Sequence, residues 1–548
     1  MALHIDPRDT VPGTIHLVDI EHHTGHHGDI VLNPKPSADP EDPLNWKPWR
    51  KQVAIWSVYT YIFGIGIATA IMYSITTDIA KDTGISVADL NTGTGLMFLF
   101  LGWGCLIWQP IAIVFGRRGV YILTSLLSIG PMIWMAYSKS VGQWYAHRIL
   151  VGLAAAPVES LPELSVPDLF FAHERGRYIG LYALFVFGSN ALAPMLAGFV
   201  AEALGWRAAI WFGVITLAVT TVIIFFTLEE TMYFRNTIEG VDAGDAVIVG
   251  QGTSKDTGSG TEESAEKRGL DTEASIPSSP APEPVFAPER TYFQKLALFR
   301  SIPGRPSVKQ MFVMMYRPLL MFFYFPCVDW AGFLYGINLS WYNVVNGTMS
   351  LILSGAPYNF STNMVGVAFV SPLIGASFGA LWSGWVGDKV ALYLARRNGG
   401  VREPEHRLWT LLVSGVVGGV GFILWGVGAA HDLHYMALIV GVGMVMATVC
   451  AGGSTAMAYD IDCFKELAGE SLILVIVIRN TLGFGMSYGI TPWLSDQGLT
   501  KTFVAVAVLS VVCNYSFLFF TTFGKRLRRF SAKKYWEFVD TLVVSSSH

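Results

Sequence analysis

Charged side chains are scarce in this sequence. Asp, Glu, Lys and Arg together make up 14% of the 548 residues, whereas soluble domains usually carry about 25%. Hydrophobic residues make up 52% of the chain, and the mean hydropathy is +0.45. The formal net charge is −4, so there is no basic surplus of the kind that binds nucleic acid. This composition argues against an ordinary soluble enzyme and favours a membrane protein.

Cysteine is also rare, and its placement excludes two further classes of protein. The spacing of the cysteines suggests neither a zinc site nor a secreted disulfide framework. They lie in or beside apolar segments, at Cys105, Cys327, Cys450, Cys463 and Cys513. Glycine-rich runs such as residues 415–428 lack the Lys-Ser/Thr pair of a phosphate-binding loop, and no nucleophile triad is evident. We therefore expect a protein without enzymatic activity, cofactor or bound metal.

The apolar residues are gathered in blocks that are long enough to cross a bilayer. A helix needs about 20 apolar residues to cross a hydrocarbon core of ~30 Å. The sequence contains twelve such blocks, at residues 53–74, 94–114, 120–138, 144–167, 178–200, 208–228, 317–342, 363–386, 408–429, 434–457, 472–493 and 502–523. It therefore predicts an all-α membrane protein with twelve transmembrane helices.

A long polar stretch separates the sixth block from the seventh. Between Glu239 and Glu273 it contains nine acidic and three basic residues, and "SIPSSPAPEP" follows. Such a segment cannot bury enough apolar surface to fold, so we predict a disordered linker between two six-helix halves. The predicted domains are an N-terminal tail (1–52), a first bundle (53–228), the linker (229–316), a second bundle (317–523) and a C-terminal tail (524–548).

The distribution of lysine and arginine predicts the orientation in the membrane. Most of these residues flank the spans on one side, at Lys47, Arg50, Lys51, Arg117, Arg118, Arg175, Arg177, Lys389, Arg396, Arg397, Arg402, Arg407, Lys525, Arg526, Arg528 and Arg529. This asymmetry places both termini and the linker in the cytosol. About 50 largely polar residues precede the first span, so we expect no cleavable signal peptide. Glycosylation sequons at Asn346 and Asn359 are predicted in the outer loop after the seventh span, and a third at Asn338 near that span's end.

Several longer motifs carry a resemblance to a known family. They include "DPEDPLNWKPWRK" (39–51), "FGRRGVY" (115–121), "FFAHERGR" (170–177), "EETMYFR" (229–235) and "ARRNGGVREPEHRLW" (395–409). With these motifs the chain resembles fungal members of the major facilitator superfamily, in the branch of drug:proton antiporters and polyamine permeases. The resemblance extends from residue 39 to about residue 525. It implies two pseudo-symmetric six-helix bundles that expose a central site to either side of the membrane in turn.

The resemblance also implies roles for charged residues at the inner ends of the spans. Arg117, Arg118 and Asp388 would latch helices at a cytosolic gate, although the first of the two loops has lost the acidic residue typical of the family. The alternative is that the arginines only set the orientation of the chain. Asp460 and Asp462 follow the tenth span, and we predict that they are gate or capping residues rather than ligands.

The fifth span carries a variant of the antiporter signature. The segment "GSNALAPMLAG" (188–198) retains Pro194 and Gly198 but has Ala193 where the family has glycine. This departure leaves the direction of transport open. Small residues at these positions still predict close packing between helices.

The fourth span contains charged residues that are costly in hydrocarbon. An acidic residue at the bilayer centre costs about 2.5–3.5 kcal/mol, so such residues usually face a cavity, pair, or bind a ligand. Helical spacing places Arg148 and Glu159 on one face, with Glu163 one turn closer to the inner rim. We predict that Glu159 carries the transported proton or pairs with a cationic substrate, and that Arg148 tunes it. A structural ion pair with a neighbouring helix is the alternative for both acids.

Two other spans contain candidate site residues. Asp329 in span seven and Arg479 with Asn480 in span eleven are isolated polar residues within apolar runs. Trp330 adjoins Asp329, and an aromatic ring beside an acid could hold an organic cation. Ordinary packing is the alternative for the tryptophan.

Together these features predict a proton-coupled secondary transporter of a small organic molecule. We expect it to export a toxic compound or secondary metabolite, and to act as a monomer in the plasma membrane. The vacuolar membrane or another internal membrane remains possible. One alternative is a proton symporter that takes up a polyamine-like or other cationic nutrient. Another is a sensor built on the transporter scaffold that does not transport.

Overall fold

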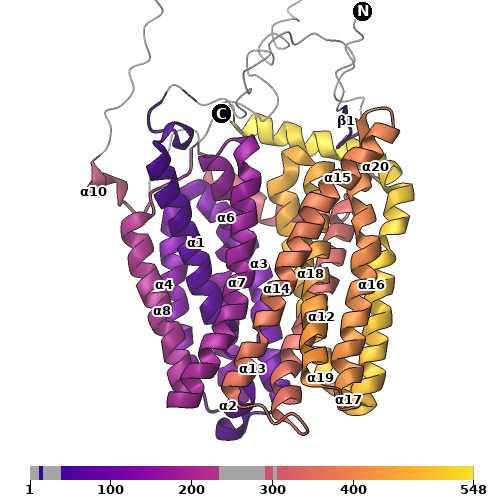
Figure 1. Cartoon of the computed structure of the whole chain (residues 1–548). Helices are drawn as coiled ribbons and strands as arrows, with labels where there is room; N and C mark the ends of the chain where they lie inside the picture. The colour runs from indigo at the N-terminus through magenta and orange to yellow at the C-terminus, as the bar shows by residue number, and fades with distance from the viewer. Residues whose placement is uncertain (1–10, 17–36, 38, 234–290, 300–304, 547–548) are drawn as a thin grey trace, which may run out of the picture.

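The computed structural model describes residues 11–16, 37, 39–233, 291–299 and 305–546, and nearly all of its regular structure is helical. Long helices run side by side through the height of the molecule (Figure 1). The α-helices are α1 (Pro48–Ala70), α2 (Thr76–Thr83), α3 (Val87–Phe115), α4 (Arg117–Tyr137), α5 (Val141–Ala155), α6 (Pro157–Leu169), α7 (Ala172–Leu204), α8 (Trp206–Thr227), α10 (Tyr292–Lys295), α11 (Val308–Met321), α12 (Pro326–Ser354), α13 (Thr362–Ala368), α14 (Val370–Leu381), α15 (Gly387–Arg397), α16 (Leu411–Phe422), α17 (Gly428–Ala430), α18 (Tyr435–Cys463), α19 (Ala468–Tyr515) and α20 (Phe517–Ser546).

Shorter elements complete the described part of the chain. They are the 3-10 turns η2 (Pro43–Asn45), η4 (Pro404–Thr410) and η6 (Lys465–Leu467), the π-helical turns η3 (Trp382–Val386) and η5 (Ile423–Val427), and the strands β1 (Ile15–His16) and β2 (Val401–Arg402). The two strands pair antiparallel, with Ile15 opposite Arg402. The N-terminal tail thus contacts the second half of the molecule.

The predicted all-α membrane fold is confirmed. Ten helical stretches among the described residues are long and apolar enough to cross a membrane, and a bent pair of helices raises this number to 11. One of the ten, residues 465–541, covers two predicted spans. The chain leaves the helical conformation at Gly498 (φ 72°), which separates these two spans. Every one of the twelve predicted blocks therefore has a helical counterpart.

The seventh span differs from its predicted position. Residues 317–342 straddle a sharp bend, since α11 and α12 meet at 83° across a short break. The break precedes Pro326, which lacks the backbone N–H that a continuous helix would use. The span itself is α12, which continues to Ser354.

This shift corrects the prediction for two of the three sequons. Asn346 lies inside α12 rather than in the outer loop, and Asn338 lies in the middle of α12 rather than near the end of the span; both are buried. The side-chain amide of Asn338 is paired with that of Asn514, at 3.1 and 3.2 Å. Asn359 lies in the loop after α12 and is exposed.

The predicted linker and C-terminal tail are only partly covered by the structure. Residues 234–290 and 300–304, which form most of the predicted linker, lie outside the described residues. The end of the predicted linker is helical, because α11 begins at Val308. Ser307 starts this helix by accepting a hydrogen bond from the backbone N–H of Gln310 in a capping box. The predicted C-terminal tail is also helical, since α20 extends to Ser546.

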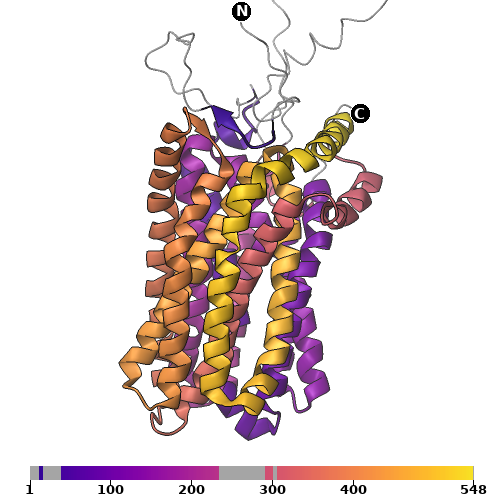
Figure 2. The same ribbon diagram turned by 90° about the vertical axis from the view of Figure 1, so that its right-hand side faces the viewer.

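The helices form two halves, and strand β1 lies on the same side of the molecule as helix α20 where α20 leaves the bundle (Figure 1). Helices α1–α8, in indigo to magenta, form one half, and α12–α20, in salmon to yellow, form the other (Figures 1 and 2). We call the side of β1 the inner side, following the predicted orientation, and the opposite side the outer side. Helix α20 leaves the bundle on the inner side and bends across it (Figure 2).

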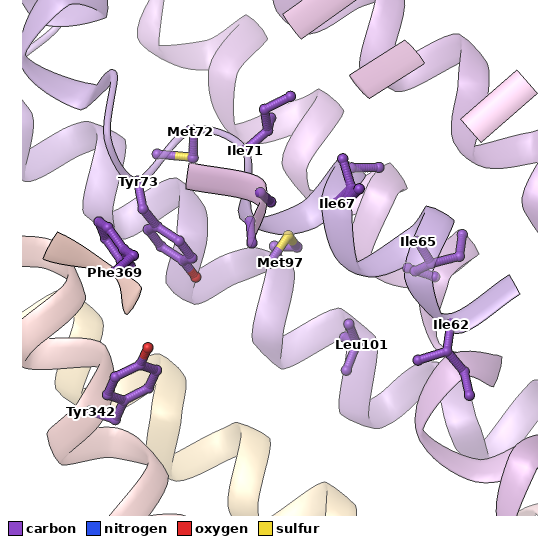
Figure 3. Close-up of a cluster of buried hydrophobic side chains, with 14 of the residues drawn as sticks. Ile62, Ile65, Ile67, Ile71, Met72, Tyr73, Met97, Leu101, Tyr342 and Phe369 are labelled. Carbon is purple, nitrogen blue, oxygen red and sulfur yellow. The ribbon is translucent and has the colours of Figure 1, made fainter. Parts of the chain in front are cut away.

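The halves are in contact near the outer side. Figure 3 shows Tyr73, which follows α1, beside Phe369 and Tyr342 of the second half. The rings of Tyr73 and Phe369 are stacked, with centroids 6.4 Å apart. Nearby, the Thr362 hydroxyl donates to the Asp78 carboxylate at 2.8 Å. The outer side is therefore closed in this structure.

Small residues allow α7 and α13 to approach closely in this outer contact. A Cβ atom at Gly198 would lie 2.7 Å from the backbone oxygen of Thr362, and one at Gly366 would lie 2.8 Å from that of Pro194. Real side chains do not tolerate such distances to backbone atoms. The close packing predicted from the signature in span five is thus realised between the two halves.

Candidate functional site

A cavity of about 370 Å³ lies between the two halves. Its walls are formed by α6 and α7 of the first half and by α12, α18 and α19 of the second. Ile179, Arg407 and Asp462 line it near the inner ends of their elements, whereas Glu159 and Arg479 lie deeper in the bundle. The outer side is closed and the cavity extends to the inner ends of these elements, so we describe the structure as inward-facing.

Glu159 bridges the two halves inside this cavity. Its carboxylate forms an ion pair with the guanidinium of Arg479 on α19. The side-chain amide of Asn480 donates a hydrogen bond of 2.7 Å to the same carboxylate. The side chains are only 18% exposed for Glu159 and 7% for Arg479. Three residues that the sequence singled out in two separate spans thus form one cluster.

Local sequence explains how Glu159 reaches the cavity. The fourth predicted span is divided into α5 and α6, which meet at Ala156 and Pro157. Pro157 stands at the first position of α6, where its missing N–H costs nothing. Glu159 therefore sits in the first turn of α6, where a negative charge interacts favourably with the helix dipole.

Three further side chains complete the polar part of the cavity wall. Glu163 lies one turn from Glu159 on α6, and Tyr182 of α7 and Tyr335 of α12 face the same space. The guanidinium of Arg479 lies over the Tyr335 ring, 4.8 Å from its centroid. The rest of the wall is largely apolar, with residues such as Val449, Met457 and Ile476.

Arg148 is not part of this site, contrary to the prediction that it tunes Glu159. It is fully buried in the first half, where its guanidinium lies against the sulfur of Met97 at 3.5 Å and the hydroxyl of Thr94 at 3.4 Å. It also contacts the sulfur of Met72. Arg148 lies on α5 and packs inside the first half, whereas Glu159 lies further along the same span on α6.

The predicted cation cage at Asp329 and Trp330 is not formed around the cavity. Trp330 is buried in the core of the second half, stacked on Phe520 with centroids 4.2 Å apart. Its indole N–H donates to the Ser516 hydroxyl at 2.9 Å. Neither Trp330 nor Asp329 lines the cavity, so packing explains the tryptophan.

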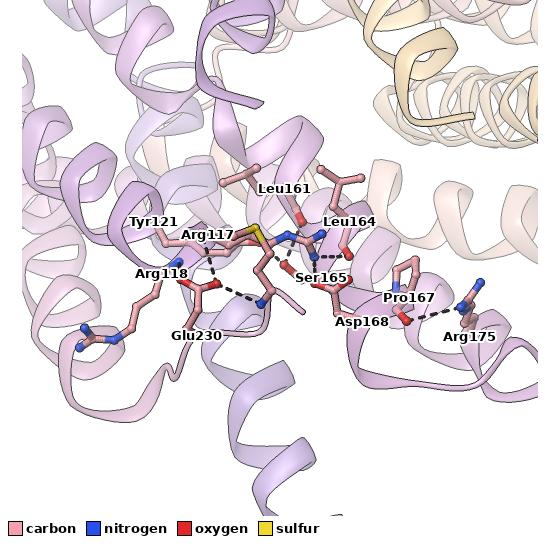
Figure 4. A network of polar contacts seen from close by, with 11 residues as sticks. Arg117, Arg118, Tyr121, Leu161, Leu164, Ser165, Pro167, Asp168, Arg175 and Glu230 are labelled. Carbon is pink, nitrogen blue, oxygen red and sulfur yellow. Dashed lines mark hydrogen bonds and ion pairs between the residues drawn. The ribbon is translucent and has the colours of Figure 1, made fainter. Parts of the chain in front are cut away.

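Arg117 and Arg118 hold the inner ends of helices together within the first half (Figure 4). Arg117 pairs with Asp168 at the end of α6. The backbone N–H groups of Arg117 and Arg118 donate to the two oxygens of Glu230, at 3.0 and 3.1 Å. Glu230 thereby binds the N-terminus of α4, where unpaired N–H groups favour an anion.

The acidic gate candidates of the second half also form contacts within their own half. Asp388 pairs with Arg407, and Asp462 lies 3.3 Å from Arg402. Asp462 lines the inner end of the cavity as expected. Asp460 does not lie at the mouth, because it is fully buried with its Oδ2 atom 2.7 Å from the hydroxyl of Ser471.

Sequence reasoning missed Tyr182, Tyr335 and Glu230. A tyrosine in a membrane helix is common at interfaces and in cores, so the two tyrosines gave no distinct signal. Glu230 lies in the "EETMYFR" motif after the sixth span. The order of the spans in the sequence does not show that this residue contacts the turn between α3 and α4. A search for acids adjacent to a span's inner end could have found it.

Two bundles of membrane helices around a cavity with a charged cross-bundle cluster define a membrane transporter, not an enzyme. The family model described as Major Facilitator Superfamily matches residues 57–470. This chain belongs to the major facilitator superfamily.

Similar proteins are found among fungal transporters. The chain is 29% identical over 528 residues to MFS-type transporter C1271.10c of Schizosaccharomyces pombe, covering 94% of this chain and 90% of the relative. It is 28% identical over 542 residues to Protein HOL1 of Saccharomyces cerevisiae, with 93% and 92% covered. Efflux pump vrtL of Penicillium aethiopicum is 23% identical over 504 residues, with 90% and 89% covered.

Solved structures of other transporters share the fold. A partially occluded, inward open structure of the xylose transporter XylE from E. coli has a TM-score of 0.54 at 11% identity, covering 86% of this chain and 99% of that chain. A peptide transporter of the POT family gives the same TM-score at 14% identity, with 86% and 96% covered.

Proposed function

We propose that this transporter is driven by protons and exports a small organic molecule, a toxic compound or a secondary metabolite, by alternating access. The observation that carries the proposal is the pairing of Glu159 with Arg479 and Asn480 across the two halves. The sequence similarity of this chain to Efflux pump vrtL, which covers most of both chains, supports export.

The ion pair between the halves supplies a means of coupling. In the inward-facing state Arg479 stabilises Glu159 as a carboxylate. When the halves move to open the outer side, this pair separates, and an unpaired buried carboxylate is several kcal/mol too costly to persist. Glu159 would then take up a proton from the outer side. Pairing with Arg479 again on the return would release that proton to the inner side.

The cavity favours a neutral or cationic substrate. Glu159 and Arg479 compensate each other's charge, which leaves the acid Glu163 in the wall. The tyrosines Tyr182 and Tyr335 offer ring faces, to which organic cations are attracted. A cation in the cavity would also compete with Arg479 for Glu159, which would link substrate binding to the release of the pair.

Flux into proteoliposomes tests both coupling and direction. The purified protein is reconstituted and offered a panel of organic cations and neutral metabolites under two opposite pH gradients. An antiporter accumulates substrate when the vesicle interior is acidic, whereas a symporter accumulates it when the bath is acidic. Glu159→Gln should abolish accumulation under either gradient without changing the yield of folded protein.

Proton-driven uptake of a cationic nutrient is the second candidate. The acidic cavity wall supports it as well as export, because neither Glu159 nor Glu163 indicates a direction. Accumulation only with an acidic bath would favour this candidate. Absence of accumulation of any compound under both gradients would contradict proton-coupled transport and favour a sensor. Action as a monomer in the plasma membrane remains our prediction.

A further inference from the structure

Asp460 is the most deeply buried carboxylate among the acids singled out above, and it lies outside the cavity wall. It is located on α18 near its inner end and is 0% exposed. Its Oδ1 atom has no hydrogen-bond partner among the described residues, and its Oδ2 atom lies 2.7 Å from the Ser471 hydroxyl. The mechanism proposed above does not use this residue.

Among the described residues, the basic groups nearest to Asp460 are paired with other acids. On α19, the Ser471 hydroxyl is hydrogen-bonded to Asp460. The adjacent Glu470 forms an ion pair of 3.0 Å with Arg317. Two basic residues line the cavity, and both are paired with other acids, Arg479 with Glu159 and Arg407 with Asp388. Within the part of the chain that the structure describes, no Lys, Arg or His forms an ion pair with Asp460.

The other ionisable groups around Asp460 are acids or neutral. The facing helix α12 carries the acid Asp329 beside Trp330, and the nearby cavity wall carries Glu163 of α6. The closeness of α12 and α18 here is visible in the ring contact between Trp330 and Tyr459, with centroids 5.3 Å apart. The Tyr459 hydroxyl is itself buried without a hydrogen-bond partner among the described residues. Negative neighbours would repel a carboxylate at Asp460.

We propose that Asp460 holds a proton in the inward-facing state and is a second proton-carrying residue of the transport cycle. A fully buried carboxylate without a cation is strongly disfavoured, and the neutral acid is the form that persists in such a place. The inference rests on the proton coupling proposed above and assigns opposite charge states to two acids. Glu159 is ionised on Arg479 while Asp460 is neutral.

The hydrogen-bond geometry fits the protonated form. The Ser471 hydroxyl lies 2.7 Å from Asp460 Oδ2 and 3.2 Å from the backbone oxygen of Ala468. A protonated Asp460 donates to Ser471, and Ser471 then donates its own proton to Ala468, so that both acceptors are used. An ionised Asp460 would compete with Ala468 for the single hydroxyl proton.

The proposed step is an exchange of one proton with water. Asp462, two residues along α18, lines the inner end of the cavity, so movement of this helix end admits water near Asp460. The O–H bond of Asp460 breaks, the proton passes to that water, and a carboxylate remains. Uptake of a proton from water restores the neutral acid before the helices pack again.

Two measurements on the full-length protein test the proposal. Infrared difference spectra of the reconstituted protein at neutral pH should show the carbonyl band of a protonated carboxyl group that is absent in Asp460→Asn. In flux assays, Asp460→Asn should lower pH-driven accumulation about tenfold or more, because a group that releases no proton adds no driving force. Exchange of substrate without a gradient should continue, since asparagine resembles the neutral acid in shape.

Asp496→Asn serves as the matched control, because Asp496 is exposed near the outer side, away from the cavity. It should retain both the infrared band and pH-driven accumulation. An ionised Asp460 in the spectra, or wild-type accumulation in Asp460→Asn, would overturn the proposal. If the wild-type protein itself shows no pH-driven flux, the proposed function fails. The infrared band still reports the protonation of Asp460 in that case. If Asp460→Asn does not fold, Ser471→Ala replaces it, because loss of the hydroxyl that contacts Asp460 should shift the frequency of the same band.

Discussion

Glu159 on α6 and Arg479 on α19 form an ion pair between the two halves of the transporter. Their residue numbers differ by 320, and each lies in a different half of the molecule. The pair is therefore a contact that exists only while the halves have the arrangement seen here. This makes it a sensitive place to test both stability and coupling.

Removal of Arg479 alone should destabilise the protein. Arg479→Met leaves Glu159 buried without its cation, a change that costs about 3–5 kcal/mol at fully buried pairs. We expect a loss at the low end of that range, because the Glu159 side chain is 18% exposed. The double variant Glu159→Gln/Arg479→Met should recover much of this loss. Thermal unfolding in detergent measures both, and a double variant no more stable than Arg479→Met would contradict the pairing.

Glu230 should contribute more to stability than the adjacent Glu229. Glu230 is buried and accepts from two backbone N–H groups at the start of α4, so Glu230→Gln should cost about 1–3 kcal/mol. Glu229 pairs with Arg50 nearer the surface, and Glu229→Gln should cost about 1 kcal/mol or less. Thermal unfolding of the two variants gives the comparison. Equal losses would mean that Glu230 does not stabilise the α3–α4 turn.

A larger side chain at Gly198 should open the outer side. Its Cβ atom would overlap the backbone oxygen of Thr362, so Gly198→Val should separate α7 from α13. Gly180→Val is the control, because open space surrounds that position on the same helix. To measure opening, Asn91, which is buried, is replaced by cysteine in each variant. The rate at which an impermeant thiol reagent added from outside labels this cysteine then reports its accessibility. Labelling should accelerate in Gly198→Val only, and unchanged labelling would place the closure elsewhere.

Of the three sequons at Asn338, Asn346 and Asn359, only Asn359 should be glycosylated. It is exposed on the outer side, whereas Asn338 and Asn346 are buried in α12. In a eukaryotic host, treatment with a glycosidase should shift the mobility of the wild-type protein and of Asn346→Gln. The shift should be absent in Asn359→Gln. A shift that persists in Asn359→Gln would show that another site is used.

The candidate site could be predicted in part from single residues. Glu159, Glu163, Arg479 and Asn480 stood out because ionisable and amide groups are rare in hydrocarbon. The same signal also selected Arg148, which is buried in the first half beside two methionines. Charge in a span indicates that a residue has a polar environment or a special partner. It does not indicate which helix supplies that partner.

The sequence by itself determined the all-α membrane fold and the class of protein, since length and hydropathy follow from local composition. Only the tertiary structure decided which polar residues meet. The partners of Glu159 and of Glu230 come from helices far away in the chain, and the bend before Pro326 sets how α12 enters the bundle. Contacts between distant segments depend on how all helices pack together, and no local pattern records that arrangement.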